Sequence, residues 1–171
     1  MKIDLKKLAG LSAGRVPFSE SLDLRGETLY GAKPFQNPVQ INGEITSESG
    51  VLRMTGTVQT VYSTACARCL KPLDVPLSAR VDTVLTDEPD AEEDDDLFVL
   101  TGDSVDTADV FVPALILQVQ MTYLCREDCK GLCPHCGADR NEVACDCESK
   151  QIDPRFAALR ALLDSDADRD N

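Results

Sequence analysis

The chain has 171 residues and a formal net charge of −13, with 43% hydrophobic residues and no tryptophan. The length allows one ordinary domain and a small appendage, and the acidic charge excludes proteins that hold nucleic acid by neutralising its phosphates. We therefore expect no tight direct binding to RNA, and we expect a basic protein as partner. No apolar run reaches the roughly 18 residues of a membrane span, and the charged N-terminal residues lack the apolar stretch of a signal peptide. These features predict a cytoplasmic protein with reduced cysteines.

The first 38 residues show no clear hydrophobic period, and their prolines predict no long element. From residue 39 onward apolar and polar residues alternate, which predicts a three-stranded antiparallel meander over residues 39–85 with one buried face. The polar cluster Ser47–Gly50 predicts the turn between the first two strands. The alternation shifts phase near residues 56–61, which predicts a β-bulge or a strong twist there.

An acidic run follows the meander at residues 87–96, where eight of the ten side chains are carboxylates. Like charges at this density repel one another and cannot pack, so the run is predicted to be an exposed loop. A solvated linker is the more ordinary interpretation. The alternative is a docking surface for a basic partner, carried by Asp94, Asp95 and Asp96.

Residues 106–121 fit either a helix or a strand. Because the stretch is long for a strand, we favour a buried helix, capped by Asp106 or Asp109 and with Pro113 in its first turn. Its buried face would carry Val112, Leu115, Ile116 and Val119. The apolar run Leu97–Leu100 before it predicts a short strand.

Asp153 and Pro154 predict the start of a C-terminal helix, because Asp is a favoured N-cap and Pro suits the first helical position. The whole pattern predicts an α+β fold: an antiparallel β-meander or half-barrel with one buried helix, a cysteine-rich zinc-knuckle segment and a C-terminal helix. In domains, we expect a β-rich core at 1–124, a zinc-binding segment at 125–150, and a C-terminal helix with an acidic tail at 151–171.

Eight cysteines carry the strongest chemical signal in the chain, and four of them form two CxxC pairs at Cys66–Cys69 and Cys133–Cys136. In a chain without an export signal, such spacing points to metal binding and not to disulfides. A tight CxxC turn places two sulfurs at the spacing that a tetrahedral Zn²⁺ needs. Four thiolates leave no open position on the ion, so we predict two structural zinc ions.

The simplest division of the cysteines joins pairs that are neighbours in sequence. It gives a first group of Cys66, Cys69, Cys125 and Cys129, and a second group of Cys133, Cys136, Cys145 and Cys147. The first would join the meander to a distant segment and the second would close a local loop, so the first is expected to matter more for the fold. The alternative division combines Cys66 and Cys69 with Cys133 and Cys136, and spacing alone does not decide between the two.

Four cations lie beside the first group in the sequence and would offset the charge of a zinc ion with four thiolates: Arg68, Lys71, Arg126 and Lys130. Ordinary exposed charges are the alternative interpretation. His135, the one histidine, stands between two knuckle cysteines, so its side chain is expected to point away from their ion. Without further histidines or a nucleotide-binding motif, we predict neither an enzyme nor a small-molecule substrate.

The cysteine motifs also follow a recognisable order. They are Cys66-Ala67-Arg68-Cys69 after a strand, Cys125 to Gly137 with its Cys133-Pro134-His135-Cys136 turn, Cys145-Asp146-Cys147, and Ile152 to Phe156. This order resembles the YceD-like family from about residue 39 to residue 163. The resemblance implies a role in accumulation of large-subunit ribosomal RNA in bacteria and plastids, with no catalysis. Not all relatives carry all eight cysteines, which implies that the second zinc orders the C-terminal segment.

Two functions from different classes follow. The first is a non-catalytic zinc-binding factor in ribosome biogenesis that binds the precursor of the large subunit or a basic ribosomal protein. The alternative is a redox-sensitive zinc protein whose cysteines release metal on oxidation. A thiol-disulfide oxidoreductase ranks last, because its CxxC opens a helix and Cys66 and Cys69 are predicted to lie in a β-turn.

Overall fold

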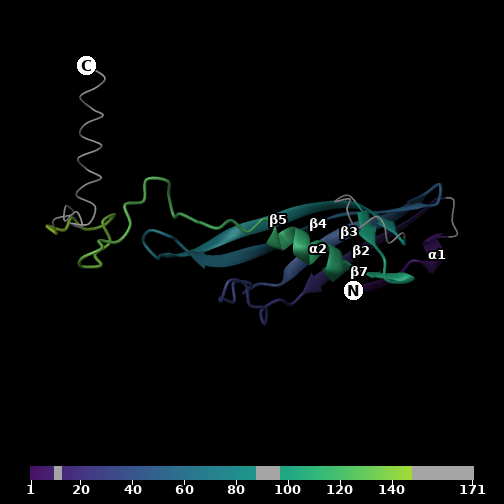
Figure 1. Cartoon of the computed structure of the whole chain (residues 1–171), viewed down its shortest axis with the longest axis horizontal. Coiled ribbons are helices and arrows are strands. Elements are labelled where there is room, and N and C mark those ends of the chain that lie inside the picture. The colour runs from purple at the N-terminus through teal and green to yellow at the C-terminus, as the bar shows by residue number, and fades with distance from the viewer. Residues whose placement is uncertain (10–12, 88–96, 148–171) are drawn as a thin grey trace, which may run out of the picture.

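A computed structural model describes residues 1–9, 13–87 and 97–147 of the chain. The elements in chain order are β1 (Lys2–Asp4), α1 (Lys6–Ala9), β2 (Ala13–Leu22), β3 (Val39–Glu48), β4 (Val51–Ala65), β5 (Pro72–Thr86), β6 (Leu97–Val99), β7 (Ser104–Asp106) and α2 (Thr107–Ile116). Figure 1 shows a curled sheet with α2 across one face, and the segment after α2 running to the end of the molecule opposite α1. The described part is therefore mostly β, with α2 as its main helix.

A five-stranded sheet in the order β2-β3-β4-β5-β6 forms the body, and β1 pairs with β7 beside it. Strands β2 to β5 are antiparallel to their neighbours, which confirms the predicted meander. The short strand predicted at residues 97–100 is confirmed as β6. It runs parallel to β5, with Val84 opposite Leu97, so the sheet as a whole is mixed. Ten residues separate β5 from β6 in the sequence, so the two strands need not be joined by the two-residue turn of an antiparallel hairpin.

The β-bulge predicted near residues 56–61 is wrong. Residues 52–65 of β4 pair with residues 72–85 of β5 in one unbroken antiparallel register. The inward positions of β4 are the even-numbered ones, and Gly56 and Thr60 occupy two of them. Gly56 leaves space for Phe111, since a Cβ on Gly56 would lie 2.8 Å from the ring of Phe111. The apparent phase shift thus comes from two inward residues that carry no apolar side chain.

Strand β2 was not predicted, yet all ten of its residues pair with β3. It alternates as a strand should, with Phe18 buried and Pro17 and Ser19 exposed on either side. Because β2 lies at the end of the sheet, a proline without an N–H donor is tolerated there. Pro17 therefore interrupts the sequence pattern without interrupting the strand.

The helix favoured for residues 106–121 is confirmed as α2, although it ends at Ile116. Asp106 caps it, since its side chain accepts a hydrogen bond of 3.1 Å from the N–H of Ala108. Pro113 lies inside the helix and not in its first turn. The buried face also differs from the prediction, because it carries Thr107, Val110, Phe111 and Leu115. Phe111 sets this face, packing edge-to-face on Phe18 with ring centroids 5.8 Å apart.

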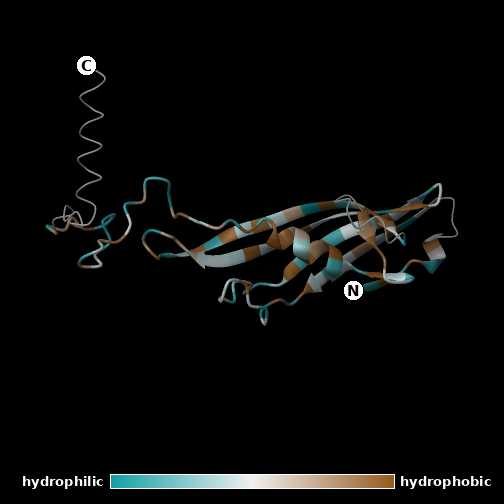
Figure 2. Cartoon of the chain, in the orientation of Figure 1, coloured by the Kyte–Doolittle hydropathy of each residue, from teal (hydrophilic) through white to brown (hydrophobic). Residues whose placement is uncertain are grey.

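The hydrophobic core lies between α2 and the inner face of the sheet. Figure 2 shows hydrophobic and polar residues alternating along the strands and hydrophobic residues where α2 meets them. No helix among the described residues is long and apolar enough to cross a membrane. The predicted C-terminal helix and residues 88–96 of the acidic run, with Asp94, Asp95 and Asp96, lie outside the described residues.

The hairpin of β4 and β5 extends past the rest of the sheet, because each of these strands has fifteen residues and β3 has ten (Figure 1). Aromatic rings support the extension. Tyr62 packs against Phe35 with ring centroids 6.0 Å apart and against Tyr123 at 5.6 Å. Tyr123 comes from the segment after α2, so this contact also brings that segment alongside the hairpin. The tip of the hairpin carries the first two cysteines.

Candidate metal centre

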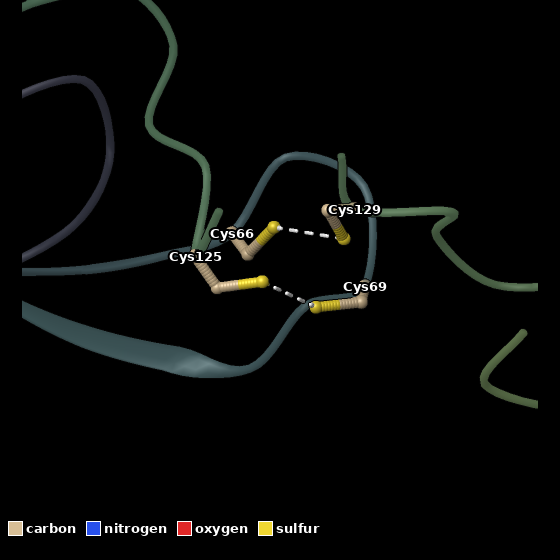
Figure 3. A group of neighbouring side chains, drawn as sticks. All are labelled: Cys66, Cys69, Cys125 and Cys129. Atoms are coloured by element: carbon tan, nitrogen blue, oxygen red, sulfur yellow. Dashed lines mark hydrogen bonds between the residues drawn. The ribbon is translucent and has the colours of Figure 1, made fainter. Parts of the chain in front are cut away.

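Cys66 and Cys69 lie on a tight turn that joins β4 to β5. The N–H of Cys66 donates to the carbonyl of Lys71 over 2.8 Å, and the N–H of Leu70 donates to the carbonyl of Cys66 over 2.9 Å. Leu70 has a φ of 61°, the left-handed conformation that closes such a turn. Figure 3 shows that the turn directs both sulfurs toward the same space.

Cys125 and Cys129 reach this turn from the segment that follows α2 (Figure 3). Backbone contacts dock the segment on the turn. The N–H of Ala67 donates to the carbonyl of Tyr123 over 2.9 Å, and the guanidinium of Arg68 donates to the carbonyl of Cys129 over 2.8 Å. The cysteines of the first group are therefore positioned by main-chain atoms on both sides.

Gly131 allows the chain after Cys129 to pack against the same turn. Its φ is +70°, and a Cβ on it would lie 2.8 Å from the carbonyl oxygen of Arg68. That oxygen also accepts the N–H of Leu132 over 3.0 Å. Any side chain at Gly131 would meet both an unfavourable backbone conformation and a fixed backbone atom.

The sulfurs of the first group all lie within 4.8 Å of one another. Cys66 and Cys129 are 3.8 Å apart, and Cys69 and Cys125 are 3.7 Å apart. Four sulfurs placed tetrahedrally about a Zn²⁺ at 2.3 Å would be about 3.8 Å apart, whereas the sulfurs of a disulfide are separated by about 2.05 Å. The donor set and its spacing therefore fit a four-coordinate metal ion.

The protein divides the thiols of the first group into two kinds. The backbone N–H of Cys125 lowers the pKa of Cys66 to about 6. Burial would raise the pKa of Cys129, but the N–H of Gly131 and the side chain of Asn141 outweigh it and lower this pKa. Desolvation and the neighbouring thiols raise the pKa of Cys125 to about 12. Cys66 therefore loses its proton more readily than Cys125, and a metal ion bound by both sulfurs would displace the proton of Cys125.

Cys133 and Cys136 of the second group lie on a hairpin turn directly after the first group, and Cys145 and Cys147 follow it in the chain. The N–H of Gly137 donates to the carbonyl of Cys133 over 2.9 Å, and the N–H of Cys133 donates to the carbonyl of Ala138 over 2.8 Å. The N–H of Cys136 lowers the pKa of Cys133 to about 6, and the thiol of Cys136 raises the pKa of Cys147 to about 12. In the second group, too, the thiol of Cys133 loses its proton more readily than the thiol of Cys147.

The structure gathers the eight cysteines by sequence-neighbouring pairs and not in the alternative division, and each group could hold one metal ion. The groups differ in exposure. In the first, only Cys125 is exposed, whereas Cys136 and Cys147 of the second are both exposed. His135 is also exposed and lines a hollow of about 500 Å³ along the second group.

The cations near the first group mainly join segments. Lys71, on the β4–β5 turn, forms ion pairs with Glu142 at 2.6 Å and with Asp139 at 3.6 Å. Arg126 donates to the side-chain oxygen of Asn141 over 2.8 Å. These contacts connect the first group to the loop inside the second group. A role in offsetting thiolate charge stays a prediction for these residues and for Lys130.

Sequence reasoning missed Asn141, whose side-chain amide lies 3.4 Å from the sulfur of Cys129. The nearest available signal is local: the backbone N–H of Asn141 donates to the carboxylate of Asp139 over 2.9 Å, a turn that Asp favours. That signal predicts a turn at Asp139 and says nothing of Cys129, which lies twelve residues before Asn141. Contact with the first group arises only from tertiary docking.

Comparison with known proteins decides the family. The family described as "Large ribosomal RNA subunit accumulation protein YceD" matches residues 54–163, which include all eight cysteines. The chain belongs to the YceD family. No solved structure matches this YceD chain.

Three relatives illustrate the range of the family. The YceD chain is 28% identical over 165 residues to "Large ribosomal RNA subunit accumulation protein YCED homolog 1, chloroplastic" of Zea mays, covering 77% of this chain and 56% of the relative. It is 34% identical over 127 residues to an uncharacterised protein of Mycobacterium tuberculosis, covering 70% and 58%. It is 26% identical over 171 residues to YlbN of Bacillus subtilis, covering 97% and 98%. The chain thus spans less than two thirds of the maize and mycobacterial relatives, and nearly all of YlbN.

Proposed function

We propose that this YceD protein is a non-catalytic zinc-binding factor in the biogenesis of the large ribosomal subunit, acting in the cytoplasm through a basic protein partner. One observation carries the metal part of the proposal: the sulfurs of the first group are 3.8 Å and 3.7 Å apart, close to the edge of a zinc–thiolate tetrahedron. Family membership supports the ribosomal part.

Four thiolates at tetrahedral spacing are a donor set that favours zinc. The four side chains of each group would fill every position on the ion. A substrate or water molecule would then have no place to bind, which supports a structural role and argues against catalysis. The first group would join the β4–β5 hairpin to the chain at Cys125 and Cys129, so its metal would contribute directly to the stability of the fold.

Metal analysis tests this part. Full-length protein purified under reducing conditions without chelator should contain two zinc ions per chain by plasma mass spectrometry. The double variant Cys136→Ser/Cys147→Ser should retain one zinc ion, because both substitutions fall in the second group. A wild-type protein that holds one zinc ion or none would contradict the proposal.

The ribosomal part rests on the relatives, since the maize protein and the family are both named for accumulation of large ribosomal subunit RNA. A cell that lacks this chain should show a lower ratio of large-subunit to small-subunit ribosomal RNA. The wild-type gene and the Asn42→Asp variant, changed on the exposed face of β3, should both restore the ratio. Cys69→Ser should fail to restore it. An unchanged ratio in the deletion strain would remove this part of the proposal.

The partner is inferred from charge. A chain with a net charge of −13 repels ribosomal RNA at long range and attracts basic proteins, whose association it would accelerate. A basic large-subunit ribosomal protein should therefore bind, and bare ribosomal RNA should not. Binding should weaken as salt rises, because exposed charges are screened beyond about 8 Å at physiological ionic strength.

Substituting Asp94, Asp95 and Asp96 with Asn tests whether the acidic run takes part. The triple variant should associate with the basic protein more slowly in stopped-flow mixing, with little change in dissociation. An unaltered association rate would leave the acidic run as a solvated linker. Tight, salt-resistant binding to bare ribosomal RNA would overturn the choice of a protein partner.

A redox-sensitive role is the second candidate, and the exposure of Cys136 and Cys147 favours it. A peroxide could oxidise these two thiolates to a disulfide, taking up two protons and releasing two water molecules for each peroxide, and the second group would lose its metal. Under mild peroxide one zinc ion should be released before the other and restored by a reductant. Simultaneous release of both ions, or no release, would argue against this candidate.

A further inference from the structure

Asn141 stands between the two cysteine groups. In the sequence it lies inside the loop of the second group, between Cys136 and Cys145. In space its side-chain amide donates to the sulfur of Cys129, in the first group, over 3.4 Å. Asn141 is half-buried at this junction. One residue therefore belongs to the loop of one group and to the surroundings of the other.

The hydrogen bonds of Asn141 fix the orientation of its amide. Its side-chain oxygen accepts the backbone N–H of Lys130 over 2.7 Å and the guanidinium of Arg126 over 2.8 Å. With the oxygen held by two donors, the amide nitrogen must face the other way, toward Cys129 and the carboxylate of Asp139 at 2.6 Å. The amide thus directs an N–H at the sulfur of Cys129.

The loop that carries Asn141 begins and ends at cysteines of the second group. The loop leaves the Cys133 turn through a bridge between Leu132 and Asp139, and it returns at Cys145. A metal ion held by all four sulfurs would tie the two ends of this loop together and so reduce the conformations open to Asn141. Without that metal, only the contacts of the loop itself would keep the amide at Cys129.

A second set of contacts crosses the same junction. Lys71, from the β4–β5 turn of the first group, pairs with Glu142 and with Asp139 on either side of Asn141. The N–H groups of Asn141, and after them the ammonium of Lys71, lower the pKa of Asp139. The pair with Glu142 is exposed and weak, whereas the side chain of Asp139 is 15% exposed; both pairs join the loop of Asn141 to the β4–β5 turn.

We propose that the two cysteine groups bind metal cooperatively, and that Asn141 is the positioning residue through which occupancy of the second group raises the metal affinity of the first. This inference rests on the proposed zinc-binding function. Because coupling between two binding equilibria is reciprocal, metal in the first group raises the affinity of the second by the same factor. The exposed group thereby adjusts how firmly the buried group holds its ion.

A double-mutant cycle on the full-length chain tests the coupling. The probe is ¹¹³Cd²⁺, which replaces zinc in thiolate sites, and NMR separates the two groups while a chelator competes for the metal. Asn141→Asp keeps the oxygen acceptor for Lys130 and Arg126 but puts a carboxylate beside the thiolate of Cys129. Cys136→Ser/Cys147→Ser removes the second group at two exposed positions. Asn42→Asp makes the same charge change on β3 and serves as the matched control.

Asn141→Asp should lower the cadmium affinity of the first group by about 10-fold or more, as loss of a hydrogen bond to a ligand does in other metal sites. Removal of the second group should lower it by a similar factor. The two changes together should cost little more than either alone, because both act through Asn141. Asn42→Asp should leave both affinities within about 2-fold of wild type.

Two results would overturn the inference alone: an affinity of the first group that is unchanged when the second is removed, or effects of the two changes that multiply. A wild-type chain in which neither group binds cadmium would instead overturn the proposed function and the inference with it. Circular dichroism of each variant shows that its sheet is intact, so that a lost affinity is not a lost fold.

Discussion

Replacing Gly131 with alanine should weaken the junction between the β4–β5 turn and the cysteine segment. Gly131 and Gly137 offer a matched pair, because both follow closely after a cysteine and both have a positive φ, of +70° and +73°. They differ in surroundings. A Cβ on Gly131 would lie 2.8 Å from the carbonyl oxygen of Arg68, whereas a Cβ on Gly137 would have nothing within 4 Å.

The magnitude follows from this difference. A left-handed conformation costs an alanine about 1–2 kcal/mol, and both variants lose this much. At Gly131 the new methyl must also push away the oxygen of Arg68, which accepts the N–H of Leu132 over 3.0 Å. Loss of that hydrogen bond costs about 1 kcal/mol more, and the strain adds to it. We expect the free energy of unfolding to fall by about 2–4 kcal/mol in Gly131→Ala and by about 1–2 kcal/mol in Gly137→Ala.

Guanidinium unfolding at a fixed free zinc concentration measures both losses, and the fixed concentration matters because bound metal adds to the measured stability. The rate of hydrogen exchange at the amide of Leu132 gives a local measure. This rate should rise in Gly131→Ala and stay near wild type in Gly137→Ala. If the two variants lost the same free energy of unfolding, the backbone of Arg68 would not constrain Gly131, and the packing argument would be refuted.

Three further outcomes are expected. Cys69→Ser should remove one metal ion and lower the free energy of unfolding of the whole sheet, measured by guanidinium titration. Cys147→Ser should lower this free energy less. The reverse order would show that the first group does not stabilise the sheet by joining the hairpin to the later segment. Metal affinity should rise with pH and fail as pH drops through about 6, because Cys66 and Cys133, whose pKa values lie at about 6, then also take up protons. Zinc retained well below pH 5 in a dialysis series would contradict this. Gly56→Ala should lower the stability measured by thermal unfolding by about 1–3 kcal/mol, since its Cβ would lie 2.6 Å from a backbone oxygen of β3 and 2.8 Å from Phe111. Gly26→Ala, whose Cβ would have nothing within 4 Å, should be nearly neutral. Equal effects of the two variants would rule out overpacking at Gly56.

The meander could be predicted because one buried face makes apolar residues alternate with polar ones along each strand. The cap at Asp106 could be predicted because an N-cap depends only on residues close together in the sequence. Strand β2 could not be predicted. Phe18 is the one buried residue among those of β2 whose burial the structure describes, and its neighbours are Pro17 and the polar Ser19. The buried face of α2 was also misjudged. Phe111 fits over Gly56, a complementarity between distant positions that no helical period reveals.

The candidate site, too, could be predicted from the sequence only in part. Pairing by sequence neighbours gives both cysteine groups, because short CxxC and CxC spacings already place sulfurs together. The residues that surround the two groups cannot be predicted from the spacing of the cysteines. Asn141 and Gly131 matter through contacts with Cys129 and Arg68, which form only after the segment beyond α2 docks on the hairpin. From the sequence, the two groups therefore look independent, and the contacts between them are visible only in three dimensions.

The long hairpin of β4 and β5 also sets an order of events during synthesis. Its strands pair with near neighbours in the chain, so they can form as soon as Thr86 has been made. Cys66 must wait for Cys129, which follows 63 positions later. Throughout that interval the turn at the hairpin tip presents two thiols without their partners, one of them with a lowered pKa once the site is built. A reducing environment protects such half-sites, and the metal closes the structure only after most of the chain is in place.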